Sequence, residues 1–220
     1  MEWKNYLNTK NVTTTEIIEQ FETYVDDTTE LSSTQELALL NKVYQKILSF
    51  KAWQILKKEA TGTMLTTTTI AVPTRFRAFV INQNMTDNSQ AATFNSRPAG
   101  IYINGIKWLQ VINWDDRRQY ANQDGFAYYD AANSTITTTY PQPAGATYSF
   151  DYIEKQADLT AGQSPIIPDE FQWSIVHGMA AEDMIIQLFD KARSYADENK
   201  RAYASYIADM CMWDANFYCN

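Results

Sequence analysis

Apolar residues recur every three or four positions in the first part of the chain. Thr13 and Glu16 have the spacing of a capping box, and Ile17, Phe21 and Val25 follow at helical intervals. This pattern predicts a short amphipathic helix, which the polar run at 26–29 ends.

A second capping pattern, Ser33 and Glu36, precedes a longer apolar stripe. The stripe predicts a helix that packs against neighbouring helices, and Gly62 marks its predicted end. Its apolar positions are Leu37, Leu40, Tyr44, Ile47 and Leu48, with Ile55 as a further candidate.

From Thr63 onward the pattern changes to short β-branched and aromatic runs separated by turn residues. Asn104 and Gly105, between two such runs, predict a two-residue hairpin. The polar stretch 82–96 is predicted to be a long loop. Because the runs follow one another every 8–12 residues or so, they favour an antiparallel sandwich or small barrel. The predicted strands are 64–72, 76–81, 100–103, 108–114, 126–129, 134–140 and 147–153.

Helical spacing returns after Pro168, which lies beside Asp169 and Glu170 in a predicted first turn. The pattern leaves two arrangements open for 194–200: a bend between two helices, or the interior of one long helix. The apolar positions of the first stretch are Phe171, Ile175, Met179 and Ile186, and those of the second are Tyr203, Tyr206, Met210, Trp213 and Phe217.

The order of these elements predicts an α+β fold. N- and C-terminal helices form a helical bundle, and the central domain is an antiparallel β sandwich or small barrel. The predicted domains are N-terminal helices at 1–62, a β-rich domain at 63–160, and C-terminal helices at 161–220 that complete the bundle.

Composition and charge narrow the function classes. The 220 residues are 45% hydrophobic and 14% aromatic, enough apolar mass to exclude disorder for most of the chain. Lys plus Arg is 18 and Asp plus Glu is 26, a net charge of −8, which disfavours tight binding to nucleic acid. We expect a soluble protein without a membrane span or signal peptide, since no long apolar run or basic leader is visible.

Catalytic motifs are scarce. The single histidine, His177, lies in an apolar helical stretch and predicts a partly buried, hydrogen-bonded ring. There is no nucleophile elbow and no glycine-rich phosphate loop. Two cysteines, Cys211 and Cys219, and one histidine cannot complete a structural zinc site, and their pairing stays open. We therefore expect no catalytic residues, metal or cofactor.

Four carboxylates near predicted strand ends offer an enzymatic alternative. Paired carboxylates beside aromatic rings are typical of glycosidases, and the rings alone of sugar-binding modules. The same residues equally fit solvated turns with local ion pairs. They are Asp115, Asp116, Asp124 and Asp130, near Trp108, Trp114, Tyr128 and Tyr129.

Several turn-and-strand motifs in this order carry a family resemblance. They comprise Trp53 near the end of the first helical stretch and the segments 72–77, 125–130, 136–143, 147–152 and 165–171, with Leu159 ahead of the last. Over about residues 30–190 the chain resembles the head-to-tail adaptor proteins of tailed bacteriophages.

The resemblance implies a non-enzymatic virion structural protein, made in the host cytoplasm and located at the head–tail interface. Such adaptors form a ring, commonly of twelve copies, under the portal and offer a platform to the tail or nozzle protein. The genome passes through the lumen without specific binding, and a membrane is not involved. Another phage ring or tail-tube protein, or a carbohydrate-binding β module, is the alternative.

The aromatic C-terminus is the predicted interface, with Trp213, Phe217 and Tyr218 as its anchors. Two interpretations stay open: docking onto the portal or a neighbouring subunit, and packing within the chain. Truncation at Asp209 is expected to separate them, because docking predicts a folded product that no longer binds the portal.

Overall fold

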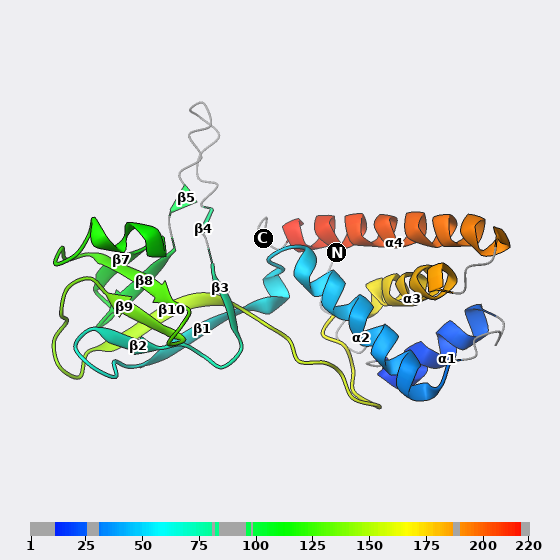
Figure 1. The fold of residues 1–220 in the computed structure, drawn as a ribbon, viewed down its shortest axis with the longest axis horizontal. Helices are drawn as coiled ribbons and strands as arrows, with labels where there is room; N and C mark the ends of the chain where they lie inside the picture. The colour runs from blue at the N-terminus through cyan, green and yellow to red at the C-terminus, as the bar shows by residue number, and fades with distance from the viewer. Residues whose placement is uncertain are drawn as a thin grey trace, which may run out of the picture. The chain divides into compact units, whose positions relative to one another are not determined.

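The computed structural model describes residues 12–25, 31–80, 82–83, 96–97, 99–186 and 190–216. The chain divides into two compact units. The helical unit consists of Met1–Ile55 and Gln156–Asn220, and the β unit consists of Leu56–Lys155. The fold is α+β, as predicted, with helices in one unit and the sheet in the other (Figure 1).

Four α-helices are present among the described residues, and each lies in the helical unit. They are α1 (Thr14–Tyr24), α2 (Ser33–Phe50), α3 (Trp173–Ile186) and α4 (Asp190–Asn216). Short 3-10 turns are η2 (Gln54–Leu56), η3 (Trp114–Arg118) and η4 (Asp169–Phe171). The stretch 194–200, left open by the sequence, is the interior of α4.

The two N-terminal helices begin at capping boxes. The one at Thr13 and Glu16 is confirmed. The one ahead of α2 was predicted one residue too late, because Ser32 and Gln35 form the box while Glu36 is buried. The helix also ends earlier than Gly62, since Lys51 is already extended and Trp53 is fully buried behind it.

Helix α3 is the apolar centre of the helical unit and contacts α1, α2 and α4 (Figure 1). Ile175, Val176 and Met179 are fully buried, on more than one side of the helix. Gly178 permits the close approach of the neighbours, since a Cβ at this position would lie 2.5 Å from Val43 Cγ1. The glycine thus sets the spacing between α3 and α2.

The C-terminal turn of α4 is tied to the residues that follow α2. Asp214 is 2% exposed, and its carboxylate accepts a hydrogen bond from the backbone N–H of Gln54 at 2.7 Å. Its second oxygen lies 2.8 Å from Lys51 Nζ. This buried ion pair anchors the end of α4 within the helical unit.

The main sheet of the β unit has the order β1-β10-β6-β7-β8-β9-β2, and β3 pairs with β10 beside this path. The sheet is mixed and nearly closed: all its pairs are antiparallel except β7 with β8. The strands are β1 (Lys57–Thr63), β2 (Thr69–Ala71), β3 (Phe76–Phe79), β6 (Gly100–Ile103), β7 (Lys107–Ile112), β8 (Phe126–Asp130), β9 (Thr135–Thr138) and β10 (Thr147–Glu154).

The predicted antiparallel sheet is therefore wrong at one pair. A parallel pair needs a crossover of about a dozen residues. The segment 113–125, which contains η3, supplies that crossover between β7 and β8. Turn-like residues in this segment were compatible with a hairpin, so the local pattern did not reveal the crossover.

Three strand assignments also differ from the prediction. The expected strand at 64–72 is reduced to β2, because 65–68 bends. The polar segment of β1 was not predicted, and it is a strand because it pairs along its whole length with β10. Inside the predicted loop, β4 (Asn82–Gln83) pairs with β5 (Ser96–Arg97).

The hairpin between β6 and β7 is confirmed, but its predicted two-residue loop is one residue too short, because Ile103 pairs with Lys107 and 104–106 connect the strands. Asn104 and Gly105 have φ of 51° and 69°, the positive values that a type I′ turn requires. The turn places Ile101, Ile103 and Leu109 on the inner face of the sheet, where they join Ile136 in the buried core.

Replacing Gly178 with alanine tests the close contact of α3 with α2. Helix propensity alone predicts a gain of up to about 1 kcal/mol for Gly178→Ala. We expect a net loss instead, because the added Cβ meets buried Val43 and overpacking costs about 1–3 kcal/mol. The measurement is thermal or urea unfolding followed by circular dichroism at 222 nm.

Val43→Ala provides the matching control because it removes the atom that Gly178→Ala would strike. The double variant should be more stable than the sum of the single effects by about 0.5–3 kcal/mol. Strict additivity would contradict the contact.

A carboxylate shared by two lysines predicts a pH-dependent contribution to stability. Glu182 lies 2.7 Å from Lys42 Nζ and 3.1 Å from Lys46 Nζ, and the hydrogen bond from Lys42 is the main cause that lowers its pKa below 4.5. A lowered pKa in the folded state stabilises the protein above the unfolded pKa, and this stabilisation is lost as pH falls through the folded pKa.

Glu182→Gln should therefore lower stability by about 0.5–1 kcal/mol at neutral pH, since both lysines are half exposed. The difference from wild type should shrink as pH falls below 4.5 and disappear once Glu182 is protonated in the folded protein. Glu198→Gln, at an exposed position of α4, is the control and should have little effect at either pH. A difference for Glu182→Gln that persists at acid pH would show that the ion pairs do not cause it.

Candidate functional site

Of the three predicted interface residues, Trp213 lies in the described part of α4. It is half-buried, and its ring meets Phe171 edge-on at 5.8 Å between centroids. Phe217 and Tyr218 lie outside the described residues. Trp213 thus packs within the helical unit, which leaves Phe217 and Tyr218 as the untested part of the predicted interface.

The C-terminal turn of α4 cannot be removed without loss of buried groups. Met210 is fully buried, and Asp214 holds Lys51 and Gln54. Truncation at Asp209 would delete both residues, so a failure to bind could follow from a damaged core. Substitutions beyond Asn216 separate docking from folding more cleanly.

The side of α4 away from Met210 and Asp214 is exposed, with small residues around Met212, which is 61% exposed. The residues share the helical spacing of one surface stripe. They are Arg201, Ala204, Ser205, Ala208, Met212 and Ala215, and we call this surface the α4 outer face. Exposed acidic residues flank these positions: Asp197 and Glu198 one turn before Arg201, and Asp209 next to Ala208.

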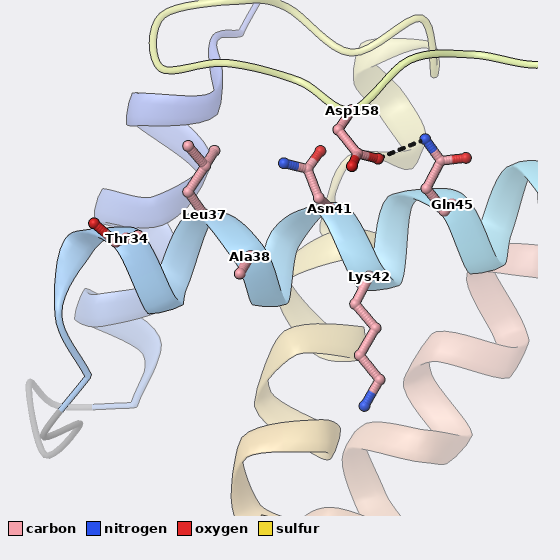
Figure 2. A pocket seen from close by; sticks show the side chains of 7 residues that line it. All are labelled: Thr34, Leu37, Ala38, Asn41, Lys42, Gln45 and Asp158. Atoms are coloured by element: carbon pink, nitrogen blue, oxygen red, sulfur yellow. Dashed lines mark hydrogen bonds between the residues drawn. The ribbon is translucent and has the colours of Figure 1, made fainter.

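A shallow groove of about 540 Å³ runs along α2 (Figure 2). The segment after β10 forms its second wall, held by paired hydrogen bonds between the Asn41 amide and the backbone of Leu159 at 2.7 and 2.9 Å. Gln45 donates to Asp158 Oδ1 at 3.0 Å. The lining residues of this α2 groove are Thr34, Leu37, Ala38, Asn41, Lys42, Gln45 and Asp158.

Helical periodicity alone did not reveal the groove. It predicts that positions such as Ala38 and Lys42 face outward, which the structure confirms. Asp158 reaches the same surface from more than a hundred residues away, through contacts that are not periodic. The sequence feature that could have indicated the groove is Asn41, a residue in the middle of a helix whose amide can hydrogen-bond to another segment.

The sequence-predicted carboxylates have structural partners. Asp124 accepts a hydrogen bond from Lys107 at 2.6 Å, which lowers the pKa of this carboxyl, and Asn133 does the same for Asp130. A glycosidase acid needs a raised pKa, the opposite direction. Asp115 and Asp116 lie exposed in η3, within the crossover segment.

Two partly exposed aromatic residues of the β unit lie opposite each other on neighbouring strands. Trp108 pairs with Tyr102 across β6 and β7, and both are partly exposed. A Cβ at Gly100 would lie 1.8 Å from Trp108 Nε1, so only glycine lets the indole lie against the strand. Trp114 is also exposed, and the guanidinium of Arg117 lies over its ring, 3.1 Å from the centroid.

His177 has the structural role that its sequence context predicts. Its Nδ1 lies 2.9 Å from Asn199 Oδ1, and because an amide oxygen only accepts, the ring nitrogen donates. The hydroxyl of Tyr24 donates to the same oxygen at 2.9 Å. Tyr206 stacks on the imidazole at 5.7 Å. The histidine links α1, α3 and α4.

The described residues hold no group of three or more His, Cys, Asp or Glu side chains arranged to bind a metal ion. None of the helices described is both long and apolar enough to cross a membrane.

Comparison with known proteins identifies the family. No curated protein matches the chain. The model of the family described as SU10 adaptor protein matches residues 12–216, which include both compact units. This match covers most of the chain and agrees with the resemblance to phage adaptors that its turn-and-strand motifs carry. The protein therefore belongs to the SU10 adaptor protein family, a family of bacteriophage adaptor proteins.

Proposed function

We propose that the protein is a head-to-tail adaptor that forms a ring under the portal of a tailed bacteriophage virion. The ring, commonly of twelve copies, connects the capsid to the tail or nozzle protein. The observation that carries this proposal is the match of the SU10 adaptor family over residues 12–216. The role is structural and requires no catalytic group or cofactor.

The helical unit is well suited to hold such a ring together. In this proposal its helices act as the predicted bundle, and broad helix surfaces make the contacts between copies. The α4 outer face and the α2 groove are exposed surfaces of this unit that such contacts could use. Aromatic residues beyond Asn216 would add anchors for the portal.

The acidic charge of the chain supports passage of the genome. Each copy carries −8, and a ring multiplies that charge around a shared axis. A lumen of the same sign as DNA repels phosphates at short range and lets the genome slide. Salt screens the effect beyond about 8–10 Å, so only residues that line the channel contribute. A neutral or basic inner wall would contradict this part of the proposal.

The proposed ring predicts an assembly of defined mass. Native mass spectrometry of the full chain, alone and with its portal ring, should give a species near twelve subunits. The alternative outcome that also supports the proposal is a monomer that becomes a ring only on the portal. A monomer indifferent to the portal would contradict it, and a glycan array with wild type and Trp108→Ala would then test the sugar-binding alternative.

The proposed role of the C-terminal aromatic residues as portal anchors predicts an effect on binding. The double substitution Phe217→Ala and Tyr218→Ala should weaken portal association at least tenfold, because truncating an aromatic anchor costs about 2 kcal/mol or more. Surface plasmon resonance on an immobilised portal ring measures the change. Tyr195→Ala, at an exposed aromatic position of α4, is the control and should bind normally. Unchanged binding by the double variant would exclude these residues as anchors.

A further inference from the structure

Two surfaces of the helical unit have complementary features. The α2 groove is shallow and is lined along α2 by small and polar side chains and by Lys42, which is paired with Glu182, with Leu37 near one end. The α4 outer face has small side chains and one prominent apolar residue, Met212. Small residues allow two helix backbones to approach closely, and an exposed methionine fills irregular apolar space.

The outer face is long enough to cover the groove. Thr34 and Gln45 are eleven residues apart on α2, about 16 Å at 1.5 Å per residue, and Arg201 and Ala215 are fourteen residues apart on α4, about 21 Å. An antiparallel alignment therefore covers the groove with the face from end to end.

Charge selects the antiparallel direction. Asp158 lies beside Gln45, at the end of the groove opposite Thr34, and its Oδ1 accepts a hydrogen bond from Gln45. Within the described part of the chain, neither Asp158 nor Arg201 has an oppositely charged partner. Antiparallel docking brings Arg201 to Asp158 and Met212 to the Leu37 end. Parallel docking would leave both charges unmatched.

One copy cannot make this contact with itself. Helix α3 contacts both α2 and α4, and the buried residues of these two helices, such as Val43 and Met210, lie on the sides away from the groove and the outer face. In Figure 1, α3 lies between α4 and α1, and in Figure 2 Asp158 of the return segment meets Gln45 on one side of α2 while Lys42 extends from the other side. The contact must therefore come from a second copy.

We propose that the α4 outer face of one copy docks antiparallel into the α2 groove of the next, with Arg201 paired to Asp158. This inference rests on the proposed ring. The contact is heterologous, because each copy offers its outer face to one neighbour and its groove to the other. Such contacts generate closed rings when the rotation between copies closes.

Charge reversal tests the pair. Arg201→Glu and Asp158→Arg should each weaken assembly of the full chain about tenfold or more, because each places like charges together at the contact. The double variant restores opposite charges and should assemble within about threefold of wild type. Arg118→Glu, at an exposed position of η3, is the control. Native mass spectrometry and sedimentation, with and without the portal ring, measure assembly.

The outcomes separate the interface from the function. The proposed interface would be overturned if the wild-type chain forms a ring and neither single reversal weakens it. It would also be overturned if the double variant assembles no better than the single variants. Either result would leave the proposed ring itself standing. Reversals that weaken portal binding without affecting contacts between copies would make the portal the occupant and also overturn the interface. A wild-type chain that stays monomeric with and without the portal would overturn both proposals. Circular dichroism confirms that each variant is folded.

Discussion

The contact at Gly178 is the constraint on which the helical unit depends. Helix α3 is apolar on several sides, so it is stable in water only when other helices cover it. The missing side chain at Gly178 lets Val43 approach and brings α2 close. With α3 at the centre, α2 and α4 each keep one face free of it, and these free faces are the surfaces available for assembly.

Apolar packing alone does not fix the end of α4 or the return segment after β10, and polar side chains hold both in place. Asp214 joins the last turn of α4 to Lys51 and Gln54, and Asn41 holds the return segment at Leu159. Burying a carboxylate is costly unless it is paired. Asp214 therefore fixes one arrangement of α4 against the residues that follow α2, the arrangement in which its partners are in reach. The return segment, 156–159, forms a wall of the α2 groove. The contacts that close the fold therefore also shape the surface proposed for assembly.

Local patterns predicted the elements better than their partners. The capping box at Thr13, the hairpin at Asn104 and the helical spacing after Pro168 depend on nearby residues, and each was predicted within one to a few positions. The parallel pairing of β7 with β8 and the polar strand β1 were missed because distant strands impose them. Likewise, Asp158 reaches the groove from a segment that no periodicity connects with α2.

For a protein that works by assembly, the exposed residues hold more functional information than the buried ones. Periodicity divides α4 into an inner and an outer side but does not distinguish a solvated surface from an interface. The distinction comes from the composition of the exposed side. Ala204, Ala208 and Met212 of α4 make few hydrogen bonds with water, and in the α2 groove the charge of Lys42 is already paired with Glu182. Arg201 and Asp158 are left as charges of opposite sign on separate surfaces. In the proposed ring both charges would be paired at once, and every added copy would repeat the same pair.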